Sequence, residues 1–239
     1  MRPLARVSLL AWLAVLGGLA VQVAWHATQA PAVARYEPLG EPPEVAALRL
    51  LSLGESALAS RVLSLWLQGH DTQPGLSVPL RELDYQRVAR WLERSLELDP
   101  RSSYPLLAAT RVYAAVNDDE RRRQMLDFVY ARFLERPNER WRWMAEAAII
   151  AKHQLHDLPL ALRYASAITE HAPGAPGWAR DMSVVVLEDM GELEAARLLL
   201  GGLLHEGRLR DPREIRFLER KLQELEARLE ESRPGTRSP

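Results

Sequence analysis

The chain has 239 residues, enough for one helical domain with appendages, and a hydrophobic content of 47% that can build a core. Its formal net charge of -1 excludes the basic surface that nucleic-acid binding needs. Because it contains no cysteine, disulfides, thiolate catalysis and lipoprotein acylation are excluded as well. Only Lys152 and Lys221 among the 31 basic residues are lysine, a bias typical of a GC-rich bacterial genome.

Residues 7–25 form an uncharged, largely apolar run that follows Arg2 and Arg6. A helix over this run would be roughly 28 Å long, close to the hydrocarbon core of a bilayer. We therefore expect residues 1–25 to hold a single transmembrane anchor of a bacterial inner membrane. Basic residues favour a cytoplasmic N-terminus, which would place the rest of the chain in the periplasm. A cleaved signal peptide stays an alternative, since small residues occur over 28–34, but the run exceeds a usual signal core.

Residues 26–43 are rich in proline and lack apolar periodicity, which predicts an extended linker. Between two later helical stretches, residues 69–79 form a long insertion that we expect to be irregular and to serve recognition. The remaining periodic stretches predict helices bounded by proline, glycine and capping acids. Helices are predicted over 44–52, 56–68, 83–98, 104–116, 118–135, 139–154, 159–171, 177–190 and 193–205.

A proline followed shortly by an aromatic residue recurs three times. The prolines are 37 and 36 residues apart, a period that indicates stacked helix pairs. This period predicts a helical solenoid. The three pairs are Pro100 with Tyr104, Pro137 with Trp141, and Pro173 with Trp178.

Residues 139–171 resemble a tetratricopeptide repeat, whose small residues let two helices pack closely. Residues 95–100 resemble the end of such a repeat, and residues 191–196 resemble its segment between helices. The copies depart from the family in length, which is 34 residues there, and Met125 occupies a small position. The resemblance implies an all-α solenoid of antiparallel helix pairs, TPR-like, over residues 44–207. It implies a structural core that contains Tyr104, Trp141, Ala145, Ala161, Ala165, Trp178, Gly191 and Ala196.

The last predicted helix, over residues 208–231, carries apolar residues at spacings of three and four. Such a seam fits a helix that caps the open end of the solenoid, or a coiled coil that joins two copies in a homodimer. Residues 232–239 are polar and predict a disordered tail. The seam residues are Ile215, Leu218, Leu222, Leu225 and Leu229.

Candidate catalytic and metal-binding groups are few. His153, His156 and Asp157 share one stretch, but they fall where the repeat needs a turn and lack the HExxH spacing of a zinc site. His70 and Asp71 are adjacent in a loop, and no nucleophile motif accompanies them. We expect no catalytic residue, no cofactor and no metal ion.

Candidate partner-binding residues lie in two places. His70, Asp71 and Gln73 belong to the insertion, while Arg142 and Trp143 have a cation and an indole that could contact a ligand. By contrast, residues 121–123, three arginines that follow acidic residues, are most simply a solvated helix face.

The features together predict a membrane-anchored, non-enzymatic scaffold of the cell envelope that binds a protein partner through a helical groove. The alternative is an accessory or assembly subunit of a membrane enzyme or secretion complex, held by its span. The two hypotheses differ in which part retains the partner, the soluble domain or the span.

Overall fold

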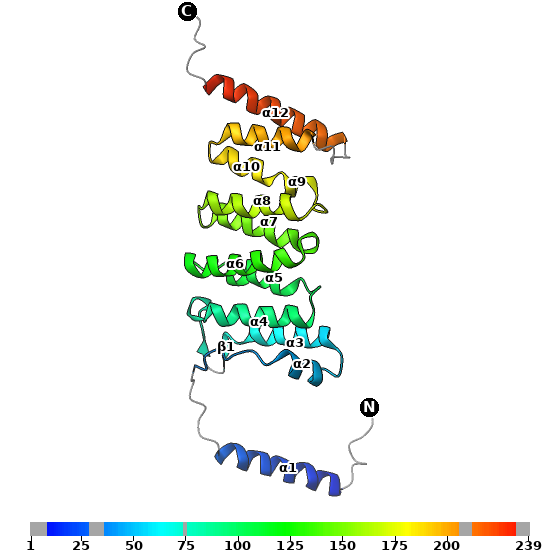
Figure 1. Cartoon of the computed structure of the whole chain (residues 1–239). Helices are drawn as coiled ribbons and strands as arrows, with labels where there is room; N and C mark the ends of the chain where they lie inside the picture. Colours follow the sequence, from blue (N-terminus) through cyan, green and yellow to red (C-terminus); the bar gives the residue numbers. More distant parts are fainter. Residues whose placement is uncertain (1–8, 29–35, 74–75, 206–211, 233–239) are drawn as a thin grey trace, which may run out of the picture. The chain divides into compact units, whose positions relative to one another are not determined.

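A computed structural model describes residues 9–28, 36–73, 76–205 and 212–232 (Figure 1). The chain forms two compact units, one of residues 1–37 and 72–77 and the other of residues 38–71 and 78–239. Almost all described elements are helices, as predicted. Arg2, Arg6 and residues 233–239 of the tail predicted over 232–239 lie outside the described residues, while Ser232 is the last residue of α12.

In the smaller unit, helix α1 (Leu9–Thr28) contains a window, Ala11–Thr28, that is long and apolar enough to cross a membrane. None of this window is buried. A signal sequence near the N-terminus can also be this long and apolar. The helix therefore fits either an anchor or a signal sequence, and its apolar side chains have no cover from the described residues.

The insertion contains a short hairpin, which corrects the prediction of an irregular segment. Strands β1 (Thr72–Gln73) and β2 (Leu76–Ser77) pair antiparallel, with Thr72 opposite Ser77. The Gln73 side chain accepts a hydrogen bond from the Glu37 backbone N–H (2.9 Å) and donates one to the Glu37 carbonyl (2.8 Å). The Gln73 side-chain amide thus pairs with the Glu37 backbone as a neighbouring strand would. Turn-forming residues occur in hairpins and in irregular loops alike, so the sequence did not separate the two.

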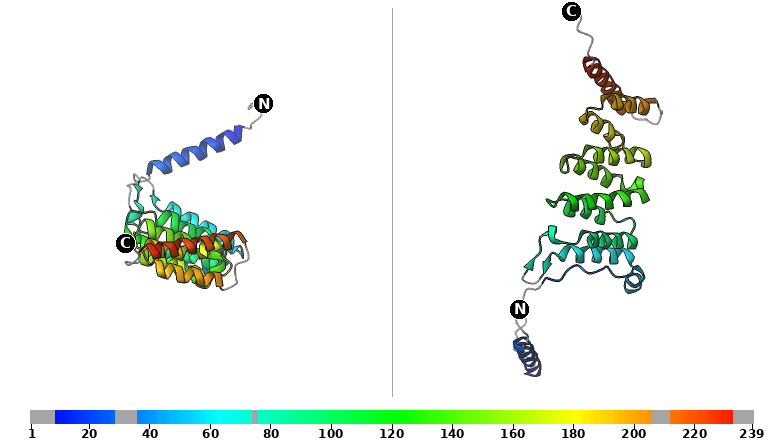
Figure 2. Two further views of the ribbon diagram at one scale, coloured as in Figure 1. Left: turned by 90° about the horizontal axis from the view of Figure 1, so that it is seen from above. Right: turned by 60° about the vertical axis from the view of Figure 1, so that its left-hand side comes forward.

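In the larger unit each helix packs mainly on the helices before and after it in the chain, so the helices form layers in chain order (Figures 1 and 2). Two short non-α turns, the 3-10 turn η2 (Leu80–Glu82) and the π-helical turn η3 (Ala109–Tyr113), occur among them. The α-helices are α2 (Val45–Leu51), α3 (Ser56–Gly69), α4 (Tyr85–Leu98), α5 (Tyr104–Ala108), α6 (Asp119–Glu135), α7 (Pro137–His153), α8 (Leu158–His171), α9 (Gly177–Arg180), α10 (Met182–Asp189), α11 (Leu193–His205) and α12 (Pro212–Ser232).

Small residues lie where neighbouring helices meet. Ala145 on α7 and Ala161 and Ala165 on α8 are buried, so these two helices approach closely. On α4, the hydroxyl of Ser95 lies 2.8 Å from the hydroxyls of Ser60 and Ser64 on α3. These buried hydroxyls satisfy one another and fasten α3 to α4.

Two predicted helices are interrupted. The stretch predicted over 104–116 continues from α5 into the π-helical turn η3, where the Thr110 hydroxyl donates to the Leu106 carbonyl at 3.0 Å. The stretch predicted over 177–190 breaks into α9 and α10. There the Thr169 hydroxyl of α8 donates to the Arg180 carbonyl at 2.6 Å, which draws this carbonyl toward α8. In both places a threonine side chain competes with the backbone ladder.

The arginines at 121–123 do not all form a solvated face, because Arg122 is only 6% exposed. Its guanidinium donates to the Ala114 and Val116 carbonyls, at 3.0 and 2.8 Å, and to the Gln154 carbonyl at 3.3 Å. It thereby satisfies carbonyls at the ends of η3 and α7 that have no partner within their own helix. The sequence alone does not distinguish this buried role from a surface one.

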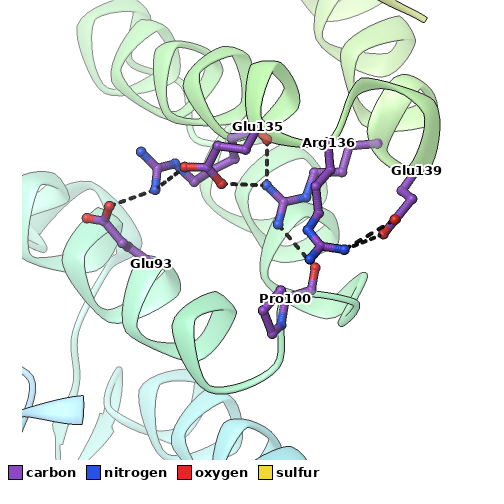
Figure 3. Close-up of polar contacts among 7 residues, drawn as sticks. Glu93, Pro100, Glu135, Arg136 and Glu139 are labelled. Carbon is purple, nitrogen blue, oxygen red and sulfur yellow. Dashed lines mark hydrogen bonds and ion pairs between the residues drawn. The ribbon is translucent and has the colours of Figure 1, made fainter. Parts of the chain in front are cut away.

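Arg140 of α7 has a similar role and is 5% exposed. It donates to the Arg132 carbonyl near the end of α6, to the Pro100 carbonyl (3.1 Å) and to Glu135 (2.8 Å) (Figure 3). Arg132 extends this network by pairing with Glu93 of α4 at 2.7 Å. One guanidinium therefore joins the turn after α4 to the junction of α6 and α7.

The apolar seam of α12 packs within the chain. Leu218 and Leu225 are buried in a cluster with residues of α10 and α11, and Leu222 packs against it. On α10, Glu188 forms ion pairs with Lys221 (3.0 Å) and Arg228 (3.2 Å) of α12. Helix α12 thus packs on α10 and α11 within the same chain.

Part of the predicted linker also belongs to the larger unit. Residues 38–43 are extended, but Leu39 is only 1% exposed and its carbonyl accepts a hydrogen bond from Arg87 at 2.6 Å. Trp91 donates to the Gly40 carbonyl at 2.9 Å, and Glu41 pairs with Arg90 at 2.7 Å. These contacts fix the segment along α4. Its prolines therefore belong to an extended segment that packs on the larger unit and not to a free linker.

Candidate functional site

Two indoles pack against each other at the surface of α7 and α9 in the larger unit. Trp141 of α7 and Trp178 of α9 lie edge to face, with ring centroids 5.5 Å apart and planes at 74°. Trp178 is 60% exposed and Trp141 is half-buried. The prediction that Trp178 belongs to the repeat core is therefore wrong, because most of this indole is exposed to solvent, although it packs against Trp141.

Charged residues surround the indoles. The Arg142 guanidinium lies 5.4 Å from the centre of the Trp141 ring and is exposed. Glu146 lies one helical turn further along α7, on the same side as Arg142. It is held by Arg111 of η3 through two hydrogen bonds, of 3.1 and 2.9 Å, which raise the pKa of Arg111. We name the surface of Trp141, Arg142, Glu146 and Trp178 the tryptophan face.

The backbone that positions Trp178 is fixed to the start of α7. The Asn138 side chain accepts a hydrogen bond from the Gly174 backbone N–H at 2.8 Å. A Cβ at position 174 would lie 3.0 Å from that side-chain oxygen, so glycine permits this close approach. Pro176 then precedes α9, whose second residue is Trp178. The sequence signal for this arrangement is the Pro-Gly-rich turn, which by itself does not show that the indole faces outward.

An open hollow of about 660 Å³ lies on the tryptophan face, and Gly174 and Pro176 line it as well. A second hollow of about 290 Å³ lies between the turn at Pro100 and the start of α7, where Trp141, Arg142 and Trp143 line it. Indoles offer large apolar area at low entropic cost, and an exposed guanidinium recognises carboxylates. Together these groups can bind a segment that carries apolar or aromatic side chains beside an acidic one.

The structure separates the predicted partner-binding residues. Arg142 and Trp143 lie beside each other on α7, and Trp143 is half-buried. His70 and Asp71 follow α3, both partly buried, and His70 packs beside Trp66 with ring centroids 5.3 Å apart. Gln73 lies in the hairpin, where its amide is used by Glu37.

Asp71 lines a different hollow, of about 440 Å³. Its other walls are mostly apolar and include Leu83 and Tyr113, whose pKa is raised by burial. The Asp71 carbonyl accepts a hydrogen bond from the Val78 N–H at 2.7 Å, which closes the base of the insertion. This region is braced by its own contacts.

The turn interpretation of residues 153–157 agrees with the geometry. Asp157 caps α8, where its carboxylate accepts a hydrogen bond from the Leu160 N–H at 2.9 Å and pairs with Arg123 at 2.7 Å. His156 has a φ of 51°, as the tight turn requires. Gly191 has a φ of 78° in the turn before α11, which places it in an exposed turn outside the helical core. Over the described part of the chain, no three His, Asp or Glu side chains gather as a metal site would need.

Comparison with known proteins gives no relative. No protein-family model matches the chain, and neither the curated proteins nor the solved structures give a match.

Proposed function

We propose that the chain is a membrane-anchored, non-enzymatic scaffold of the bacterial cell envelope, whose helical repeats bind a protein partner. The observation that carries the proposal is the tryptophan face, where two indoles, an exposed arginine and a fixed glutamate lie together. Tryptophan and arginine are the residues most enriched among the energetically dominant positions of protein interfaces. A folded segment or peptide with an acidic and an apolar side chain is the partner that fits.

A tetratricopeptide-like solenoid is the architecture that we propose for the larger unit. Its support is a set of contacts between residues about one repeat apart, each joining equivalent places in consecutive layers. These contacts are Arg123 with Asp157 (34 residues apart), Arg111 with Glu146 (35), Asn138 with Gly174 (36) and Asp127 with Tyr164 (37). Such stacking places the first helices of successive pairs side by side, where they offer one continuous surface.

Helix α1 supplies the proposed attachment to the inner membrane. Its apolar window and the basic residues before it in the sequence favour a span with the N-terminus in the cytoplasm. The larger unit would then face the periplasm. The anchor would keep the scaffold, and any bound partner, near the membrane.

The test is purification of the full chain from detergent-solubilised native membranes, followed by mass spectrometry of the retained proteins. The variant Arg142→Ala/Trp178→Ala removes two exposed side chains of the tryptophan face. The matched control is Phe217→Ala, which removes an exposed aromatic side chain from α12. We expect a partner that the wild type and the control retain and that the double variant loses.

An identical set of retained proteins in all three samples would contradict the proposal. A further sample, in which residues 9–28 are replaced by an unrelated span, separates the alternative function. Loss of the partner only in that sample would identify an accessory subunit that is held through its membrane helix.

A further inference from the structure

A second exposed apolar surface lies at the start of the larger unit, far along the chain from the tryptophan face. Helix α2 has no buried residue, and α3 exposes a stripe of apolar side chains spaced four and three apart. The turn between them adds one leucine, Leu53. We name this surface the leucine corner, and its members are Leu50, Leu51, Leu53, Leu58, Val62 and Leu65.

The turn of the leucine corner has a backbone conformation that is unfavourable for an exposed leucine. Leu53 is 92% exposed and has a φ of 51°, in the left-handed region that branched and bulky side chains avoid. Gly54 follows with a φ of 93°. A turn in water would be better served by asparagine or glycine at position 53, so both the exposure and the backbone of this leucine point to contact with something apolar.

The opposite face of α3 fixes the corner to the domain. Leu63 and Leu67 are buried, and the Ser60 and Ser95 hydroxyls lie 2.8 Å apart between α3 and α4. The stripe of the leucine corner therefore cannot turn inward. No other helix of the larger unit, within its described residues, covers it, whereas the far end of this unit is covered by α12, whose exposed side chains are mostly charged. Helical stacks need a polar outer face at each end to stay soluble.

From these observations we infer that the leucine corner inserts into the surface of the bilayer that α1 spans. This inference rests on the proposed anchoring. Residues 29–37 join α1 to the segment fixed along α4, and an extended chain of this length reaches at most roughly 30 Å. The domain therefore stays next to the bilayer, and tethering raises the effective concentration of even a weakly binding surface.

The hydropathy of the corner fits an interfacial position. Together α2 and α3 are apolar enough to meet the criterion for a membrane span, but they bend by 112° at their junction. A pair bent in this way, with one face fixed to α4, lies in the headgroup region instead of crossing. Arg49 and Arg61, both exposed, flank the leucines, where lipid phosphates would favour basic residues.

The chain has no cysteine, so single cysteines can report on each surface. We would label Leu53→Cys, Leu16→Cys in α1 and Leu198→Cys with an environment-sensitive fluorophore in the full chain. Position 198 is an exposed leucine of α11 and serves as the matched control. Each variant is reconstituted into vesicles of phosphatidylcholine and phosphatidylglycerol that contain nitroxide-labelled phosphatidylcholine.

We expect loss of fluorescence at positions 53 and 16 and none at 198. Loss at position 16 alone would overturn the leucine corner's lipid contact while the anchor stands. No loss at 16 would overturn the anchor, and the inference with it. If the label at 53 is shielded from aqueous iodide but not quenched by the nitroxide lipid, a protein covers the corner, and the lipid contact is again refuted.

Discussion

Trp178 meets Trp141 edge to face, with ring centroids 5.5 Å apart, and the two residues belong to neighbouring layers of the helical stack. Arg142 lies against the Trp141 ring, so an aromatic and a cationic group are presented together. The pair therefore contributes both to packing between α7 and α9 and to an exposed surface. Truncating each indole should therefore lower the free energy of unfolding by a different amount.

We expect Trp178→Ala to lower the free energy of unfolding by about 0.5–1.5 kcal/mol, the range for an exposed aromatic pair. Trp141→Ala should cost more, up to roughly 3 kcal/mol, because its indole is half-buried. The full 3–5 kcal/mol of a buried tryptophan would apply only if Trp141 were fully enclosed. Urea denaturation of the full chain in detergent, followed by circular dichroism, measures both. A larger loss for Trp178 than for Trp141 would contradict this geometry.

The second prediction concerns the buried guanidinium of Arg140, which joins the turn at Pro100 to the junction of α6 and α7 (Figure 3). Arg140→Ala leaves the Arg132 and Pro100 carbonyls without this donor, while Glu135 keeps its pair with Arg132, and we expect a cost of roughly 1–3 kcal/mol. The matched control is Arg136→Ala, four residues earlier, whose exposed pair with Glu139 is worth at most about 1 kcal/mol. Equal midpoints of thermal unfolding for the two variants would refute a structural role for Arg140.

A third prediction follows from the cap of α8. Hydrogen bonds from the Leu160 N–H and then from Arg123 lower the pKa of Asp157 below its ordinary value. The stability that this carboxylate adds is fully present above the unfolded pKa of about 3.9 and is lost as the pH falls through the lower folded pKa. Asp157→Asn keeps a capping side chain but cannot titrate, so its stability should fall less steeply below about pH 4.

Urea midpoints measured between about pH 3 and 6 would test this difference. Glu55→Gln is the control, since Glu55 precedes α3 but its side chain makes no capping hydrogen bond. The same pH slope in the Asp157→Asn variant and the wild type would show that the cap does not carry the acid sensitivity.

Much of the helical framework is predictable because its boundaries are marked by local chemistry. Asp118 accepts a hydrogen bond from the Arg121 N–H and caps α6, as its sequence position indicated. The buried alanines of α7 and α8 lie at positions that the resemblance to a repeat marks as core. Capping and helical periodicity act within a few residues, so a sequence pattern contains the information that defines them.

Whether a residue faces outward or is buried between layers is harder to predict. Trp178 fits an aromatic repeat position yet faces outward, and Arg122 looks like a surface cation yet is buried on backbone carbonyls. Both depend on contacts with residues of another layer, which periodicity does not encode. For the same reason the tryptophan face was not predicted from the sequence. Of its residues only Arg142 was predicted to bind a partner, together with the neighbouring Trp143.

The turn of the leucine corner gives the last prediction. Leu53 has a left-handed backbone and few contacts to lose, so Leu53→Asn should stabilise the isolated fold by up to about 1 kcal/mol. Gly54→Ala is the matched control one residue later. Its φ of 93° strains any side chain even though nothing lies within 4 Å of the new Cβ, and about 1 kcal/mol should be lost.

Urea unfolding in detergent measures both changes. If Leu53→Asn destabilised the chain as much as Gly54→Ala, the leucine would be required for folding, and its exposure would need no ligand. A stabilising Leu53→Asn would instead mean that the natural leucine is kept at a cost to the fold. That result is expected of a residue retained for contact with the bilayer.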